Sequence, residues 1–355
     1  MCTTIVKPVR KAFSPLDKQL QVRDAHWSAE LARQSVWLSG LVAFGDAAQI
    51  LEEIGQVNTS KSSVWRLSQN WGEEYRAEEE RDIESVHKLP ERDQIVAGEA
   101  SNLERMGASM DGAMVCVLEE GWKELKLGTI FSIERAKVLD KETLEEEEIG
   151  QARDVSYVAE LGGPEQLGKH LWAEACERGW TRAVDTQVVA DAAAWIWNQA
   201  ADHFYDSVQL VDWFHATEHL AKAAEWVYPD QEVARQRWLN EHKKVLFQGH
   251  AEEIARILTQ KAGEKTGQAQ AGLCQEAGYF EGQKRRMNYM EMRMDGWLIG
   301  SGTVESGAKQ YKERFTGPGM RWKRSSLQRM IPVRSAVMSG TFDQIWQKIY
   351  YSPLN

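Results

Sequence analysis

The chain has 355 residues and a formal net charge of −10, with 43% apolar and 27% charged residues. This length predicts two or three domains, and no apolar run approaches the roughly 20 residues that cross a bilayer. The first residues lack the apolar segment of a secretory signal, which favours a cytoplasmic location. The cysteines stand singly, which disfavours a disulfide framework or a Cys-based zinc site. They are Cys2, Cys116, Cys176 and Cys274.

Residues 1–96 are polar and predict an N-terminal helical domain. A first short helix runs from Phe44 to Ile54 and ends at Gly55, and a second follows the capping residues 58–60. Two helices around a glycine turn, over about residues 44–72, indicate a helix-turn-helix, although any helical hairpin gives this pattern. As a helix-turn-helix, the second helix would turn four residues toward the DNA major groove. They are Lys61, Ser62, Ser63 and Arg66.

Residues 97–225 have the sequence pattern of an α/β domain. Strands are predicted at 108–120, 122–134, 156–161, 187–190 and 208–211, with helices after the third, fourth and fifth. An acidic loop is expected at about 140–149. Residues 226–295 are predicted to form an inserted helical subdomain, and residues 296–355 to complete the α/β core with a helix and a basic C-terminal segment.

Three acids stand out by their position in this pattern. Asp111 lies inside a predicted strand, Asp191 at a strand end and Glu305 at a helix start. A carboxylate in an apolar strand is costly unless it is paired or bound to a metal. If the fold brings the three together, they would suit Mg²⁺ or Mn²⁺. For Glu305, a capped helix with a solvated face is the simpler alternative.

The segment after Glu305 is basic in an otherwise acidic chain. Between Lys312 and Arg334 there are seven cations and one acid, Glu313. A carboxylate beside such a segment favours a metal ligand held next to a polyanion.

The run from Asp212 to His219 allows several interpretations. His215 and His219 are four residues apart and would share a helix face, a spacing that can bind zinc, but no third ligand of the usual type lies nearby. Alternatively, Asp212 and His215 support the metal ligands or contact nucleic acid, or they are satisfied polar residues at a strand end. Asp212 is also the main rival of Asp191 as a metal ligand.

Five phrases carry a resemblance to a known family. MDGAMV, WKELKLGTIF, VVADAAAWIWN, VDWFHATEHL and IGSGTVESGAKQYKERFTGPGMRW occur in the same order as in DDE transposases of ISKra-type bacterial insertion sequences. These are similar in layout to Mutator-like transposases, and the resemblance covers about residues 15–345. It implies a ribonuclease-H-like core interrupted by an all-α insertion.

By position in these phrases, Asp111, Asp191 and Glu305 resemble the catalytic triad, which would hold two Mg²⁺ or Mn²⁺ ions. The family usually has glycine on both sides of the second aspartate, where this chain has Ala190 and Ala192. The basic segment would then hold DNA phosphates, with Trp322 stacking on DNA. The residues expected to contact DNA there are Lys309, Lys312, Arg314, Arg321, Trp322, Lys323 and Arg324.

The resemblance implies metal-dependent cleavage and strand transfer of DNA. The partners would be the inverted repeats at the element ends, the target DNA and further copies of the chain in a dimer or larger assembly, at the bacterial nucleoid. Two alternatives remain: a DNA-binding protein of the same fold that has lost catalysis, and a ribonuclease-H-like nuclease without strand transfer.

Overall fold

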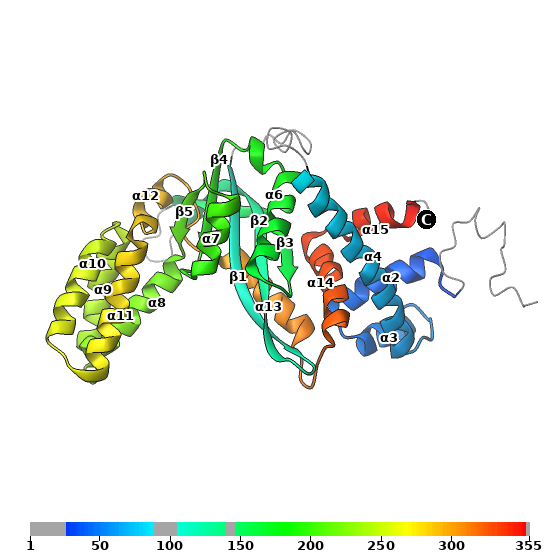
Figure 1. Ribbon diagram of the computed structural model, residues 1–355, viewed down its shortest axis with the longest axis horizontal. Helices are drawn as coiled ribbons and strands as arrows, with labels where there is room; N and C mark the ends of the chain where they lie inside the picture. Colours follow the sequence, from blue (N-terminus) through cyan, green and yellow to red (C-terminus); the bar gives the residue numbers. More distant parts are fainter. Residues whose placement is uncertain (1–25, 89–104, 140–145, 353–355) are drawn as a thin grey trace, which may run out of the picture.

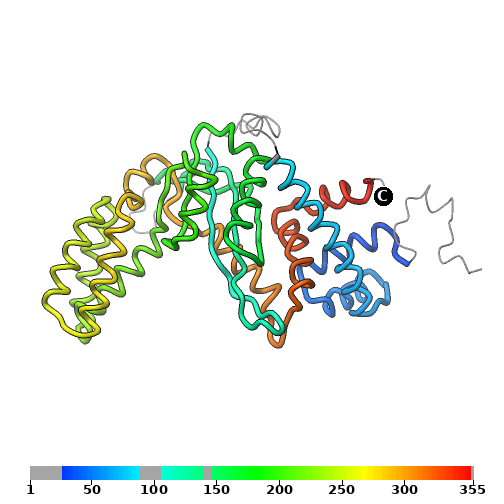
Figure 2. Tube along the Cα trace, viewed as in Figure 1, coloured from blue at the N-terminus to red at the C-terminus, as the bar shows by residue number. Residues whose placement is uncertain are grey.

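The computed structural model describes residues 26–88, 105–139 and 146–352. Figure 1 shows a central sheet with a helical arm on one side and a group of N-terminal and C-terminal helices on the other. The Cα trace in Figure 2 shows these terminal segments, blue and red, side by side. Most of the expected acidic loop, residues 140–145, lies outside the described residues.

The sheet has five strands in the order β3-β2-β1-β4-β5. β1 pairs antiparallel with β2 and parallel with β4, β3 pairs antiparallel with β2, and β5 pairs parallel with β4. The predicted α/β class is therefore confirmed, and a mixed sheet flanked by helices is compatible with a ribonuclease-H-like core. The bounds are β1 Arg105–Val117, β2 Gly121–Leu139, β3 Glu146–Glu160, β4 Asp185–Ala190 and β5 Val208–Val211.

The third strand is longer than the predicted 156–161, because β3 takes up the end of the acidic run. Glu146 and Glu148 face β2, where their carboxylates lie 3.7 Å from Lys137 and 4.0 Å from Arg135. Opposite charges across neighbouring strands stabilise a pair. This pairing explains why an acidic stretch with low β propensity extends the sheet.

Helices cover both faces of the sheet. On one face, Leu171 of α6 (Pro164–Glu177) occupies the space above Gly128 of β2. On the other, Gly307 of α13 (Gly302–Phe315) lies against Tyr157 of β3. The first face also carries α7 (Ala194–His203), reached through the 3-10 turn η1 (Trp180–Arg182) and β4, and the second carries α14 (Arg324–Ser339).

Residues 226–295 contain helices and no strand, as expected from their sequence. They form the arm in Figure 1 together with α8, and their apolar side chains continue the core of the sheet. The elements are α8 Trp213–Val227, α9 Glu232–Phe247, α10 Ala251–Gly263, α11 Gly267–Gln283, η2 Lys284–Arg286 and α12 Tyr289–Met294.

The N-terminal helices pack against the C-terminal ones. α4 is one continuous helix of 28 residues, whose Trp71 stacks on Trp346 and whose Tyr75 hydroxyl donates to the Phe342 carbonyl. No helix of the described residues is long and apolar enough to cross a membrane. The bounds are α2 Ala29–Leu41, α3 Phe44–Glu53, α4 Lys61–Lys88 and α15 Phe342–Tyr351.

Candidate functional site

The three sequence-predicted acids lie on neighbouring elements. Asp111 is in β1, and Asp191 directly follows β4, the parallel neighbour of β1. Glu305 is in the first turn of α13, which packs on β1 and β2. Residues almost 200 positions apart in the chain are thus carried to one region of the sheet.

Asp212 joins two of these elements. It is the N-cap of α8, where its Oδ1 accepts from the His215 backbone N–H at 2.8 Å. Its Oδ2 accepts from the Ser301 backbone N–H at 2.5 Å and lies 2.9 Å from the Ser301 hydroxyl. Ser301 is in turn the N-cap residue of α13, and its hydroxyl lies 3.3 Å from Glu305 Oε1. This fully buried carboxylate therefore ties the start of α8 to the start of the helix that carries Glu305.

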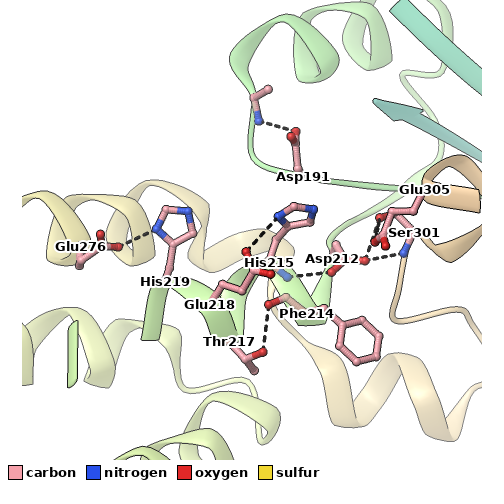
Figure 3. A network of polar contacts seen from close by, with 11 residues as sticks. Asp191, Asp212, Phe214, His215, Thr217, Glu218, His219, Glu276, Ser301 and Glu305 are labelled. Carbon is pink, nitrogen blue, oxygen red and sulfur yellow. Dashed lines mark hydrogen bonds and ion pairs between the residues drawn. The ribbon is translucent and has the colours of Figure 1, made fainter. Parts of the chain in front are cut away.

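Figure 3 shows the resulting cluster. Asp212, His215 and Glu305 each offer a ligand atom, and these atoms all lie within 4.8 Å of one another. Among the described residues this is the one group of three or more acids, histidines or cysteines so arranged, so Asp111 and Asp191 stand outside it. The structure thus groups Glu305 with the pair expected to support the metal ligands, rather than with the two aspartates of the predicted triad.

Asp111 and Asp191 nevertheless act on the same region electrostatically. Burial is the main reason that the pKa of Asp111 is raised, and the charges of Asp191 and Glu305 raise it further. The N–H of Gly112, which donates to Asp111 Oδ1 at 2.6 Å, and the nearby His215 lower the same pKa. A carboxyl whose neighbours are acidic gains from a bound cation.

The Asp191 carboxylate is turned toward its own backbone in this structure. Its Oδ1 accepts from the Ala193 N–H at 2.8 Å. Ala190 is fully buried and Ala192 packs against the same apolar core. The methyl groups of both alanines are therefore accommodated by the core.

His219 is not arranged as a partner of His215. Its Nδ1 lies 2.6 Å from Glu276 Oε2, and its ring stacks on Tyr279 with centroids 3.7 Å apart. His219 is absent from the metal-type cluster of the described residues, so the zinc interpretation gains no support. Glu276 and Ser301 were missed by the sequence analysis. Ser301 lies in the small-residue phrase that precedes Glu305, whereas no local pattern distinguishes Glu276 in α11.

The N-terminal candidates lie at an exposed helix start. Lys61, Ser62 and Arg66 are exposed in the first turns of α4, and Ser63 is half-buried. Seven residues, 54–60, separate α3 from α4. That connection is longer than the three to four residues of the usual helix-turn-helix. The helix-turn-helix interpretation therefore remains a prediction.

Two of the residues predicted to contact DNA are buried, and the prediction for them is wrong. Trp322 is 5% exposed, and its indole N–H donates to the Phe315 carbonyl at 3.0 Å. Arg314 is 2% exposed, lies over the rings of Phe44 and Trp322, and donates from Nε to the Ser39 carbonyl at 2.7 Å. Both side chains hold the N-terminal helices against α13.

The other basic residues remain accessible. Lys309 and Lys312 are exposed on α13, four and seven residues after Glu305, on the same side of the helix. Arg321 and Lys323 are exposed in the segment before α14. Arg324 is engaged by both carboxylate oxygens of Glu120, at 2.8 and 2.6 Å.

The sequence was also compared with known proteins. No protein-family model matches the chain, and no curated protein is significantly similar to it.

Proposed function

We propose that this protein is a DDE-type transposase with a ribonuclease-H-like core, which cuts DNA at the ends of its own element and joins them to a target. The observation that supports the proposal is that Asp111 in β1, Asp191 after β4 and Glu305 at the start of α13 are near enough for the charges of Asp191 and Glu305 to act on Asp111, beside the cluster of Asp212, His215 and Glu305. Their residue types and chain order match the resemblance drawn from the sequence.

The donor set fits a hard divalent cation. Asp111, Asp191 and Glu305 would supply the carboxylate oxygens that Mg²⁺ or Mn²⁺ prefers, with Asp212 and His215 beside Glu305. Bound there, two such ions would activate an attacking oxygen and stabilise a leaving oxygen.

The reaction proceeds in two displacements. Water attacks the phosphodiester at the element end and releases a 3′-hydroxyl. That hydroxyl then attacks a target phosphodiester, forming a new bond between its oxygen and phosphorus while the target's own 3′-oxygen leaves. Asp212 positions Glu305 by holding Ser301, and the exposed ammonium groups of Lys309 and Lys312 bind phosphates along the same side of α13.

Binding of the element ends is assigned to the start of α4. Lys61, Ser62 and Arg66 are exposed there, at a helix N-terminus that favours phosphate. Two ends must be cut within one complex, so we infer a dimer or larger assembly on the DNA.

A strand-transfer assay tests the proposal. The full chain is incubated with Mg²⁺, a target plasmid and labelled DNA bearing the inverted repeats that border its gene. Joined products are expected from the wild type and from Glu313→Gln, a matched control for an exposed acid of α13. They should be lost in Asp111→Asn and Glu305→Gln. Binding without cutting would instead identify a regulator, and cutting without joining a nuclease.

A further inference from the structure

The β1–β2 hairpin carries an apolar surface that the residues described by the structure leave exposed. Trp122 is 62% exposed, and Met114 and Leu118 are also exposed. Trp122 lies directly opposite Cys116 in the antiparallel register, and Met114 is two residues before Cys116. Opposite residues share a face, as do alternate residues of one strand. The side chains of Met114, Cys116 and Trp122 therefore lie on one side of the hairpin.

A third segment adds positive charge to the same side. Trp322 forms a parallel bridge with Val117, its N–H donates to the Cys116 carbonyl at 3.2 Å, and its carbonyl accepts from the Leu118 N–H at 2.7 Å. Figure 1 shows this segment, between α13 and α14, beside the tip of the hairpin. Val117 and Trp322 are both buried on the inner side. Alternation therefore turns their exposed neighbours Arg321 and Lys323 to the outer side, where Trp122 lies.

This region has a positive net charge, whereas the whole chain has a negative one. Residues 119–126 and 321–324 hold five cations and three carboxylates, in a chain of net charge −10. Glu120 is engaged by Arg324, and Glu124 by Lys126. Arg321 and Lys323 form no ion pair with any residue that the structure describes, so both are available to an anionic partner.

We propose that this surface, defined by Trp122, Met114, Leu118, Arg321 and Lys323, binds single-stranded DNA. A base stacks on the Trp122 indole while Arg321 and Lys323 bind the flanking phosphates, the combination that sequence-tolerant single-strand sites use. A second copy of this chain fits less well, because a protein interface would bury Arg321 and Lys323, which form no ion pair among the residues that the structure describes.

This surface is distinct from the carboxylate site. Asp111 and Cys116 lie five residues apart in β1, a spacing of about 17 Å along a strand. Because side chains alternate, Asp111 and Trp122 project from opposite faces of the sheet. The inference deepens the proposed function, since it assigns a place to a strand left unpaired during cutting and joining.

The test measures binding without catalysis. The full chain is titrated against a fluorescein-labelled oligo(dT) of 20 nucleotides in EDTA, with anisotropy as the readout. Loss of one base–aromatic stack in Trp122→Ala should raise Kd about ten-fold, and Trp122→Phe should restore most of the affinity. Tyr205→Ala, which removes a comparably exposed aromatic outside this surface, should leave Kd unchanged. Replacing Arg321 and Lys323 with alanine should flatten the dependence of log K on log salt by about 1.4.

Equal Kd values for wild type and Trp122→Ala would overturn the inference. So would a change in sedimentation of Trp122→Ala with no change in DNA affinity, which would identify a contact between copies. The inference and the proposed function can fail separately. Trp122-dependent binding would stand even if no strand transfer were found.

Discussion

Two clusters in this protein have the same composition and different surroundings. The site cluster joins Asp212, His215 and Glu305. The α4–α6 cluster places His170 between two acids, with Nδ1 3.3 Å from Glu160 and Nε2 3.8 Å from Glu79. Each consists of two carboxylates and one imidazole, but the first lies at the starts of α8 and α13, whereas the second lies between α4, α6 and the end of β3.

The difference lies in what surrounds the carboxylates. Asp212 is fully buried but accepts from two backbone N–H groups and lies against the Ser301 hydroxyl. Glu79 lacks such donors among the described residues, and burial raises its pKa to about 8 despite the opposing effect of His170. Residue types therefore do not distinguish the two clusters, whereas the backbone N–H donors that reach Asp212 and not Glu79 do.

The largest expected difference between the two clusters is the effect of a substitution on the rate of DNA cleavage. Glu305→Gln should lower the single-turnover rate of DNA cleavage by at least about a thousand-fold, because an amide is a poor ligand for a hard cation. Glu160→Gln, the matched change in the α4–α6 cluster, should leave that rate within about two-fold. Comparable losses in both variants would remove the distinction between the clusters.

Asp212 should matter for stability as well as for chemistry. Asp212→Asn keeps the shape but replaces one acceptor with a donor that would face backbone N–H groups. A buried donor without its acceptor costs about 1–3 kcal/mol, so we expect unfolding to become easier by about 3 kcal/mol. Urea unfolding followed by circular dichroism measures this, with the exposed Asp46→Asn as control. An unchanged midpoint would show that Asp212 does not hold α8 to α13.

The α4–α6 cluster should make the free energy of unfolding depend on pH. Because the pKa of Glu79 is raised from 4.5 to about 8, the folded state binds a proton that the unfolded state has released over this range. The free energy of unfolding should therefore fall as pH rises from about 5 to 8, by about 3 kcal/mol from this group. The raised pKa of His170 acts in the same direction.

Glu79→Gln is neutral at every pH and should remove most of this decline, leaving only the part that Glu160 and Glu174 contribute through His170. Urea midpoints measured at pH 5, 6.5 and 8 provide the test. A wild type whose stability rises over that range would contradict the assignment.

Much of the architecture could be predicted from periodicity and turn residues. The strands at 187–190 and 208–211, the helix after the third strand and the helical nature of 226–295 are confirmed. The apolar side of α4, formed by Val64, Leu67 and Trp71, is buried. These features depend on the order of neighbouring residues, which can be read directly from the sequence.

The parts that failed depend on long-range packing. Arg314 was assigned to DNA because it is basic, yet it lies on the buried stripe of α13 with Val304, Gly307, Tyr311 and Phe315. That spacing of three and four residues was visible in the sequence and should have outweighed charge. The burial of Trp322 depends on its bridge to Val117, which no local pattern indicates. The link from Asp212 to Ser301 likewise spans 89 residues.

The most direct test of the central claim is Mn²⁺ binding. The full chain is titrated with Mn²⁺ and free ion is followed by electron paramagnetic resonance, for the wild type, Asp111→Asn, Glu305→Gln and Glu79→Gln. Binding should weaken at least about ten-fold in the first two variants and remain at the wild-type level in Glu79→Gln. Binding that survives Asp111→Asn and Glu305→Gln but is lost in Glu79→Gln would place the metal in the α4–α6 cluster and contradict the account.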